Sequence, residues 1–546
     1  MATSTPHSPE PPTKKPRCNG NRSFQVEPMT RKHDTINLRP AEKLLRQLLL
    51  DCRNSMPPSP ASSNLEMWFT GGWVRDKLLG IQSHDIDATL STMTGQQFGL
   101  ELDEFLKHHG NKYQEEARKI GVPYNFKGVH VTARNPEKSK HLETAIIHIF
   151  GLDVDIVNLR KETYAQDSRN PQIEFGTAVE DADRRDATVN SLYYNLDKEE
   201  VEDFTRRGLD DMAAGIIRTP LEPYQTFVDD PLRVLRLIRF SSQFGYTIDG
   251  QAKKSMKDES IHAALNRKIS RERVGIEVMK MMNGRNPPFA FELIYEANLY
   301  STVFLEQHTG ELRDTMASLL PEQEPSSPWP SVWPRAYRSF AALLNDHTVL
   351  GEQLARSDEK EYLWLMVAYA PAAALRHTTL NTVKAMTDAL KPTSKASQLL
   401  SHAMKNMDDI LSKVDMVAHG STEHLPRSTI GVAIKSWGAT WKFQVLYSLL
   451  AEVVYKASSD DILSSILERY SKFMEYVVQQ RLQDAHLAKP IINGNELKQV
   501  FGLKTNGPFI KTALDGLMEW QFDHESATRD EAIEWLRTQK ENFGIP

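Results

Sequence analysis

The chain has 546 residues, and its 66 lysines and arginines against 72 aspartates and glutamates give a formal net charge of −6. This balance excludes a uniformly basic nucleic-acid binder but is compatible with a local basic patch. Cys18 and Cys52 are the two cysteines, so we expect a reducing compartment and neither a disulfide framework nor a zinc site. The sequence has no apolar run of about 18 residues, so we expect no membrane segment.

Residues 1–35 form the first predicted region, a disordered segment. Its opening stretch is rich in Pro, Ser, Thr and Asn, a composition typical of disorder. Residues 13–17 (TKKPR) form either a weak nuclear import signal or a solvated tail, and Met29 offers a second translation start. We therefore expect the protein in the nucleus and cytoplasm, with a mitochondrial form as an option through that second start.

Helix and strand patterns follow in chain order. Apolar residues at helical spacing predict helices, short alternating runs predict strands, and glycine and proline mark their ends. The predicted helices of the first half cover residues 41–52, residues 73–79, ended by Gly80, and residues 94–109, ended by Gly110. The predicted strands cover residues 65–70, a segment from Asp85, and residues 128–131, 144–149 and 154–157, with a polar loop at 135–144.

Gly71 and Gly72 lie in the turn between the first strand and the second helix. Glycine lets the backbone approach a phosphate, and a helix N-terminus favours anions. In the next strand, Asp85 and Asp87 are two residues apart and so project to the same side. Adjacent carboxylates repel each other unless a cation lies between them, and Mg²⁺ prefers carboxylate and phosphate oxygens. The alternative is a solvated hairpin with two surface aspartates.

The run GGWVRDKLLG (residues 71–80) followed by DID (residues 85–87) resembles the motif of the polymerase-β nucleotidyltransferase superfamily. More narrowly, it resembles the class II tRNA nucleotidyltransferases, or CCA-adding enzymes, of the eukaryotic or fungal type. This resemblance implies that Gly71, Gly72 and Arg75 bind the nucleotide triphosphate. It also implies that the aspartate pair holds Mg²⁺ and acts in catalysis.

A third candidate carboxylate follows in residues 152–160. Asp155 could act as a general base or hold a metal ion against the primer hydroxyl, and we assign it as the third catalytic acid. Asp153 lies on the same face of the predicted strand, so either aspartate, or neither, serves. The spacing to Arg160 matches the acidic position of the family better for Asp155.

Residues 183–192 (DRRDATVNSL) contain two arginines flanked by acids, which alone would suit a surface ion-pair network. The residues after them predict a packed helix start. The run resembles the class II motif R-R-D-x-T-x-N-A-L, except that Ser191 replaces alanine. The resemblance implies that Arg185 contacts the nucleotide and that Asp186 contacts the ribose, which would favour ribonucleotides.

The next predicted helix begins at Asp229 as its N-cap. Arg233, Arg236 and Arg239 recur every three residues, a pattern that in isolation is typical of a solvated cationic face. The run at residues 229–233 resembles the E/D-D-x-x-R motif that the family carries here, and Asp230 and Arg233 share a helix face. An acceptor beside a donor would pair with the amino group and ring nitrogen of C and A, and mispair with U and G at roughly 1–3 kcal/mol per unsatisfied group. We expect Arg236 and Arg239 to bind phosphate or to support Arg233.

The remaining chain is predicted to be helical. Residues 269–277 resemble the last class II motif, to which we assign support of the base-reading helix. Glycines on both sides of Lys504 predict either a contact with a tRNA phosphate or a simple turn. The predicted regions after the disordered segment are a catalytic head at 36–200, a helical neck at 201–286, a helical body at 287–485 and a tRNA-binding tail at 486–546.

The predicted fold class is therefore α+β: a small mixed-sheet, polymerase-β-like nucleotidyltransferase head followed by an all-helical neck, body and tail. The resemblance implies an Mg²⁺-dependent enzyme that adds C, C and A to tRNA 3′ ends from CTP and ATP, releasing pyrophosphate and using no nucleic-acid template. Its partner would be tRNA, and we expect a monomer. The alternatives are a poly(A) polymerase of the same superfamily and an inactive RNA-binding scaffold.

Overall fold

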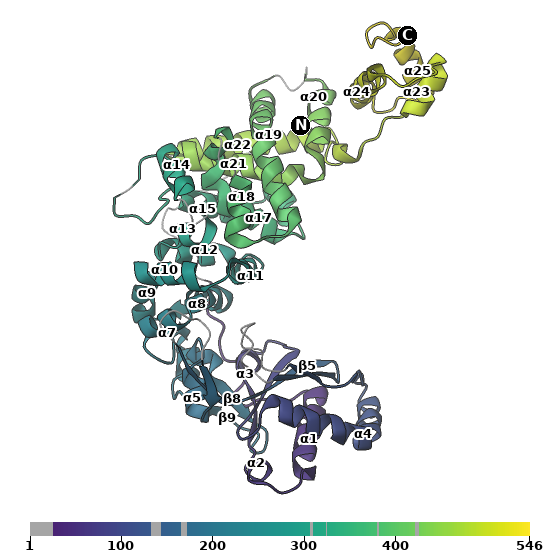
Figure 1. Cartoon of the computed structure of the whole chain (residues 1–546). Helices are drawn as coiled ribbons and strands as arrows, with labels where there is room; N and C mark the ends of the chain where they lie inside the picture. Colours follow the sequence, from purple (N-terminus) through teal and green to yellow (C-terminus); the bar gives the residue numbers. More distant parts are fainter. Residues whose placement is uncertain are drawn as a thin grey trace, which may run out of the picture.

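The computed structural model describes residue 24 and residues 26–132, 144–164, 172–305, 310–323, 325–378, 382–420 and 425–546. The residues before residue 24, for which we predict disorder, lie outside these ranges, as does nearly all of the predicted polar loop at 135–144. The molecule is elongated and curved, with the strands at one end and the C-terminal helices at the other (Figure 1). The predicted α+β class, a mixed-sheet head followed by helices, is confirmed.

The head contains a seven-stranded sheet in the order β3-β4-β5-β2-β1-β8-β9. Strands β2 and β5 run parallel, and the other neighbours pair antiparallel. Helix α4 packs on β4 and β5, and α1 packs on α4. The bounds are β1 Met67–Thr70, β2 Asp85–Leu90, β3 His130–Thr132, β4 Thr144–Ile149, β5 Leu152–Asn158, β8 Leu192–Asn195, β9 Val201–Asp203, α1 Pro40–Ser55 and α4 Gly95–Lys119.

Helix α4 continues through Gly110 to Lys119, so the prediction that it ends at Gly110 is wrong. A glycine inside a helix costs about 1 kcal/mol relative to alanine. Packing beyond the glycine outweighs this cost, because Tyr113 and Ala117 are fully buried. The Tyr113 hydroxyl also donates a hydrogen bond to the Asp51 carboxylate of α1 at 2.6 Å.

The predicted base-reading segment consists of two helices rather than one. Helix α7 (Pro223–Asp229) ends where we expected the helix to begin, and α8 (Leu232–Phe244) starts after a short break. A residue before proline is disfavoured in the helical conformation, which explains the break at Asp230-Pro231. The Asp230 carboxylate accepts a hydrogen bond from the Leu232 amide at 3.2 Å. The capping contact of α8 therefore comes from Asp230, and the predicted N-cap at Asp229 is wrong.

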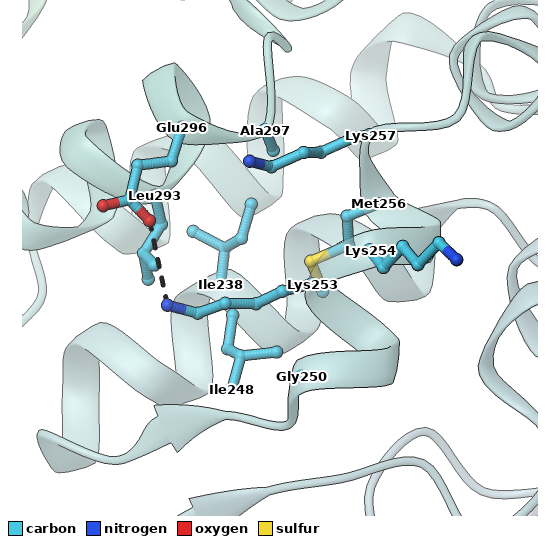
Figure 2. Close-up of a pocket in the computed structure, with 10 residues that line it drawn as sticks. All are labelled: Ile238, Ile248, Gly250, Lys253, Lys254, Met256, Lys257, Leu293, Glu296 and Ala297. Carbon is cyan, nitrogen blue, oxygen red and sulfur yellow. Dashed lines mark ion pairs between the residues drawn. The ribbon is translucent and has the colours of Figure 1, made fainter.

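A cavity of about 310 Å³ lies beside α8, near α9 (Gly250–Met256) and α12 (Pro287–Glu296). Figure 2 shows Ile238 of α8 pointing into it and the Lys253–Glu296 ion pair at its edge. Ile238 and Arg236 are two residues apart and so project to nearly opposite sides of the helix. The cavity is therefore separate from the predicted nucleotide site, and none of the predicted site residues lines it.

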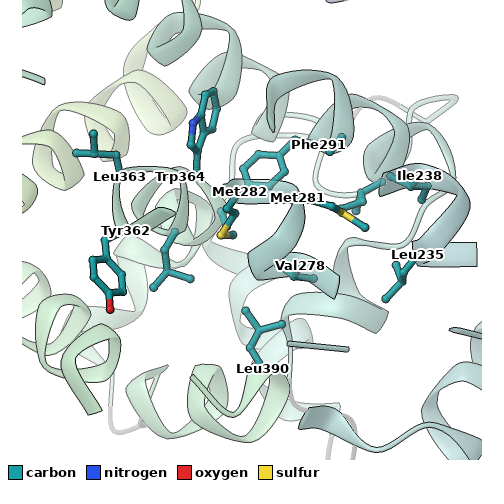
Figure 3. Close-up of a cluster of buried hydrophobic side chains, with 14 of the residues drawn as sticks. Leu235, Ile238, Val278, Met281, Met282, Phe291, Tyr362, Leu363, Trp364 and Leu390 are labelled. Carbon is teal, nitrogen blue, oxygen red and sulfur yellow. The ribbon is translucent and has the colours of Figure 1, made fainter. Parts of the chain in front are cut away.

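A buried cluster fixes the orientation of α8 and joins it to the helices that follow. Helix α11 (Arg271–Met282) packs along α8 on one side and against α17 (Lys360–Tyr369) and α18 (Thr382–Leu390) on the other. Figure 3 shows the methionines of α11 between Ile238 of α8 and Trp364 of α17. With its apolar side held in this cluster, α8 presents Arg233 and Arg236 toward the head, where they contact Arg184 and Asp186.

An extended segment at residues 26–39, continued by residue 24, contacts several parts of the molecule, and we call it the N-terminal strap. It has no helix or strand before α1. In the head, the Leu78 carbonyl accepts a hydrogen bond from the Lys32 amide at 2.9 Å, and in the neck the Phe244 carbonyl accepts one from the Met29 amide at 2.8 Å. In the body, the ring of Tyr337 lies 6.0 Å from that of Phe24, measured between centroids. The strap therefore joins three regions that are far apart in the sequence.

The other elements are short strand pairs and helices. The strand pairs are β6 Arg160–Thr163 with β7 Gln172–Phe175, and β10 Ile216–Ile217 with β11 Thr247–Ile248. The remaining helices up to residue 390 are α2 Pro60–Ser63, α3 Gly72–Leu79, α5 Ala178–Asp183, α6 Gly208–Ala214, α10 Glu259–Lys268, α13 Tyr300–Phe304, α14 Glu311–Leu319, α15 Trp333–Leu344 and α16 Val349–Ala355. The later helices are α19 Ser394–His419, α20 Arg427–Trp437, α21 Trp441–Lys456, α22 Asp460–Gln479, α23 Gly494–Phe501, α24 Pro508–Asp523 and α25 Arg529–Thr538. The 3₁₀ segments along the chain are Thr188–Asn190, Ala370–His377, Gly438–Thr440 and Ala485–Leu487.

The last three helices enclose a hydrophobic core of their own. Its buried members are Ile492, Leu497, Ala513, Leu517, Ala532, Leu536 and Ile545. Helix α24 also packs against α20 of the preceding region. Across the described parts of the chain, every helix is too short or too polar to cross a membrane.

Gly208 lets α6 lie directly against the turn Thr188–Asn190. A Cβ atom at Gly208 would lie 2.6 Å from the Thr188 carbonyl oxygen. We therefore expect Gly208→Ala to lower the free energy of unfolding by about 1–3 kcal/mol, measured by urea denaturation. Gly250→Ala is the matched control, because a Cβ there meets no atom within 4 Å. Equal losses in the two variants would contradict this explanation.

Candidate active site

Three candidate catalytic aspartates lie on one face of the head sheet. In the parallel pair β2 and β5, Asp87 lies opposite Asp155 and Asp85 lies opposite Asp153. The alternate residues of both strands are buried on the other face, while all four aspartates are exposed. The predicted projection of Asp85 and Asp87 to one side is thus present, and Asp155 stands next to Asp87 on the neighbouring strand.

The structure distinguishes Asp153 from Asp155, which the sequence leaves open. The ring Nδ1 of His148, on β4, pairs with the Asp153 carboxylate. For Asp155, no hydrogen bond or ion pair within the described residues involves its carboxylate. Asp155 lies directly opposite Asp87 in the register, whereas Asp153 lies two positions away, opposite Asp85. Asp155 is therefore the acid whose oxygens are available to a ligand at this face.

The electrostatics of this face suit a bound cation. Loss of solvation raises the pKa of the Asp87 carboxyl, and the charge of Asp85 raises it further against the opposing effect of Arg185. Loss of solvation and then the charges of Asp87 and Asp85 likewise raise the pKa of Asp155. In the described residues, no three acidic, histidine or cysteine side chains already converge as a complete metal cage. Mg²⁺ uses one or two carboxylates together with substrate phosphates and water, and such a donor set fits Asp85 and Asp87.

Gly71 brings the turn between β1 and α3 against both an aspartate and an arginine. Its backbone has φ 73° and ψ −135°, a region open to glycine. A Cβ there would lie 2.7 Å from Nη1 of Arg185 and 3.5 Å from Oδ2 of Asp87. The absence of a side chain at Gly71 thus lets the turn pack directly against Arg185 and close to Asp87, and Gly72 follows as the first residue of α3.

Arg75 lies behind this turn rather than beside the aspartates. Its guanidinium donates to Asp76 at 2.7 Å and to the side-chain oxygen of Asn190, and it stacks over the ring of Phe244 at 4.6 Å. The side chain is 11% exposed. In this conformation Arg75 joins α3 to α8, and its predicted contact with the triphosphate stays a prediction.

The arginine pair at 184–185 follows α5, and the predicted helix start after it is only a 3₁₀ turn at Thr188–Asn190. Arg185 lies over the ring of Tyr193 at 5.1 Å and is 15% exposed in its side chain. Ser191, which departs from the family pattern, is fully buried. Its hydroxyl donates to the carbonyls of Ala182 and Ala187 at 3.0 Å each, so the extra oxygen is satisfied.

Asp186 links the head to the arginines of α8. It accepts from Nε of Arg236 at 2.6 Å and from the Asn190 amide at 2.9 Å. Burial opposes its ionisation, but the charge of Arg236 and these hydrogen bonds hold the pKa of Asp186 well below its ordinary value. The carboxylate is therefore ionised, although its predicted contact with a ribose would have to share it with Arg236.

Arg236 and Arg239 converge on Glu277, a buried residue of α11. Glu277 accepts from Arg239 at 2.6 Å and from Arg236 at 3.4 Å. Both guanidinium groups also lie over the ring of Phe240, at 5.4 Å for Arg236 and 4.4 Å for Arg239. These contacts attach both arginines to α11, and the predicted choice between phosphate binding and support of Arg233 stays a prediction.

Asp230 and Arg233 lie at the start of α8. Arg233 is 8% exposed, and its Nη2 donates to the Arg184 carbonyl at 2.6 Å. Asp230 has Arg273 of α11 at 3.9 Å from its second carboxylate oxygen. The Arg184 carbonyl thus connects the base-reading candidates to the arginine pair whose other member lies beside Asp87.

The sequence reasoning missed two acidic residues of this network. Glu162, on β6, accepts from Arg160 at 2.7 Å and from Arg184 at 3.2 Å. Asp181, on α5, lies three and four residues before Arg184 and Arg185 and pairs with both. The i, i+3 and i, i+4 spacing was a usable signal for Asp181, whereas Glu162 has no local signal.

Comparison with known proteins gives a consistent picture. A family model described as the poly A polymerase head domain matches residues 67–218, and one described as a probable RNA and SrmB-binding site of polymerase A matches residues 245–310. The nucleotidyltransferase lcsQ of Purpureocillium lilacinum is 37% identical over 94% of this chain and 93% of its own. The mitochondrial CCA tRNA nucleotidyltransferase of Saccharomyces cerevisiae is 36% identical over 87% of this chain and 88% of its own.

The fold is also found among solved structures. The CCA-adding enzyme of Thermotoga maritima, solved as a complex with tRNA, superposes with a TM-score of 0.56 at 19% identity. The match covers 91% of this chain and 94% of the other. At this identity the likeness concerns the fold, and it extends over head and helices together.

Proposed function

Because the chain belongs to the family of class II CCA tRNA nucleotidyltransferases, we propose that it adds C, C and A in turn to the 3′ end of tRNA. It uses CTP and ATP, releases pyrophosphate and reads no nucleic-acid template. One observation carries the proposal: strands β2 and β5 hold Asp85, Asp87 and Asp155 on one open face beside the Gly71 turn. Arg185 lies beside Asp87 at this face, and the carbonyl of the adjacent Arg184 accepts a hydrogen bond from Arg233 of α8.

The proposed chemistry divides roles among these residues. Asp85 and Asp87 would hold Mg²⁺, which when bound offsets charge on the triphosphate and on the leaving pyrophosphate. Asp155, with its raised pKa and unengaged oxygens, accepts the proton of the tRNA 3′-hydroxyl as that oxygen attacks the α-phosphate. Arg185 and the Gly71 and Gly72 backbone bind the β- and γ-phosphates.

The proposed base selection uses Asp230 and Arg233. The Asp230 carboxylate accepts from the exocyclic amino group of C or A, and Arg233 donates to the neighbouring ring nitrogen. Arg236 and Arg239, held by Glu277, keep α8 fixed while the base is read. U and G present a carbonyl and a ring N–H instead, so they leave these groups unpaired.

The same framework suggests how the rest of the chain serves the reaction. We propose that residues 36–200 are the catalytic head, 201–286 the neck, 287–485 the body and 486–546 a tail that holds tRNA. The protein acts as a monomer. It is present in the nucleus and cytoplasm, and a mitochondrial form arises from the start at Met29.

Primer extension tests the function directly. Three tRNA transcripts, ending before CCA, after C and after CC, are offered each nucleoside triphosphate singly and in mixture. We expect two additions of C and then one of A, Mg²⁺-dependent and lost in Asp85→Ala. Open-ended addition of A would assign the chain to the poly(A) polymerases instead. Binding of tRNA without any addition would leave an inactive RNA-binding scaffold.

A further inference from the structure

Asp181 is a fully buried carboxylate at the centre of the nucleotide site's supporting network. One oxygen, Oδ1, accepts from Arg184 at 2.6 and 2.9 Å and from the Arg160 amide at 3.1 Å. The other, Oδ2, accepts from Arg185 at 3.1 Å and from the Tyr193 hydroxyl. Each carboxylate oxygen thus accepts hydrogen bonds from the guanidinium group of one arginine of the pair.

Arg185 and Arg184 contact two different parts of the site, the Gly71 turn and the start of α8. Arg185 reaches the Gly71 turn, where its Nη1 and Oδ2 of Asp87 both border the space that a Cβ of Gly71 would fill. Arg184 leads to the base side, because its carbonyl accepts from Arg233 at 2.6 Å. Asp181 is therefore the group common to the phosphate-facing and base-facing arginines.

The charges of the network balance once Asp87 is included. Arg160, Arg184 and Arg185 supply three positive charges, while Asp181, Glu162 and Asp87, which lies beside Arg185, supply three negative ones. A cation held by Asp87, as in the proposed function, would offset the charge of that carboxylate and leave one positive charge to attract an anion. Burying several charges is weak evidence for stability, because desolvation offsets the attraction, so the arrangement is better explained by what it orients.

Resting on the proposed function, we propose that Asp181 is a positioning residue that couples triphosphate binding to base selection. Through Oδ2 it holds Arg185 against the Gly71 turn, where the β- and γ-phosphates bind. Through Oδ1 it fixes Arg184, and thereby the carbonyl that orients Arg233. One carboxylate sets the geometry of both recognition elements.

The test is Asp181→Asn, which keeps the shape and removes the charge. We expect the affinity for CTP, measured by calorimetry, to fall about 10- to 100-fold, the size of loss that removal of a hydrogen-bonding partner of a metal ligand typically causes. The ratio of kcat/KM for CTP over UTP should fall as well. Glu162→Gln is the matched control, because Glu162 holds Arg160 and Arg184 but not Arg185. Its loss of CTP affinity should be at least several-fold smaller.

A double-mutant cycle separates positioning from general damage. In an Arg185→Ala background, Asp181→Asn should weaken CTP binding little further. An equal loss in both backgrounds, or an unchanged CTP-to-UTP ratio, would overturn the proposal. If Asp181→Asn does not fold, Tyr193→Phe replaces it, since it removes one donor to Oδ2, and an unchanged CTP affinity would then count against the proposal. Absence of CTP binding and addition in the unaltered protein would instead refute the proposed function.

Discussion

Asp87→Asn is expected to lower kcat for the addition of C to tRNA at least about 1,000-fold, with the fold intact. The Asp87 side chain stands between Asp85 on its own strand and Asp155 on the next. Losing the charge that positions a metal ion costs several kcal/mol of transition-state stabilisation, and about 4 kcal/mol corresponds to this factor. The measurement is single-turnover incorporation from CTP, with circular dichroism to verify folding.

Two companion variants make the expectation specific. Asp153→Asn lies on the same face but removes a carboxylate already paired with His148, so it should cost much less than Asp155→Asn. The reverse order would assign the third acid to Asp153. A loss in Asp87→Asn of less than about tenfold would contradict a role for Asp87 in holding a metal ion.

Binding of the cation itself has a readout apart from activity. Loss of solvation and the neighbouring like charges raise the pKa values of Asp87 and Asp155, so the ionised cluster is unfavourable without a counter-ion. Mg²⁺ should therefore raise the thermal unfolding midpoint of the unaltered protein by mass action. The increase should be lost in Asp87→Asn.

Asp230→Asn is expected to reduce discrimination between CTP and UTP by about 10- to 100-fold. The amide keeps an oxygen that can cap the Leu232 amide, but it also offers a donor that can pair with the uracil carbonyl. The penalty of roughly 1–3 kcal/mol per unsatisfied polar group is then removed for the wrong base. The ratio of kcat/KM for CTP and UTP on a transcript lacking CCA measures the effect.

Asp229→Asn is the control for this substitution. Asp229 is the adjacent carboxylate, but it ends α7 and accepts from the Gln225 side chain at 2.8 Å. Its replacement should leave the CTP-to-UTP ratio within about twofold, since surface substitutions of this kind are close to neutral. Similar relaxation in both variants would mean that the negative charge of the segment, rather than the Asp230 oxygen, selects the base.

Local patterns predicted the part of the site that depends on local geometry. The two-residue period places Asp85 and Asp87 on one face, and Gly80 ends α3 in the left-handed conformation as its position suggests. The three-residue spacing of Arg233, Arg236 and Arg239 likewise predicts their clustering along α8. Such features depend on neighbours within a few positions and are therefore readable from the sequence.

Features that depend on distant contacts were not predictable in this way. The continuation of α4 through Gly110 follows from packing against α1, and the break between α7 and α8 moves the capping role from Asp229 to Asp230. Glu277 is joined to the arginines of α8 only by the packing of α11 on that helix. The choice between Asp153 and Asp155 likewise depends on His148, a residue of the adjacent strand.

The N-terminal strap bears on the proposed second translation start at Met29. A polypeptide initiated at Met29 would retain the attachments of Met29 and Lys32 to neck and head, but would lack Phe24, whose ring packs beside Tyr337 of the body. The longer isoform would be tethered at three places and the shorter at two. Under the proposed second start, the choice of start codon would decide whether the strap holds the body as well as the head and the neck.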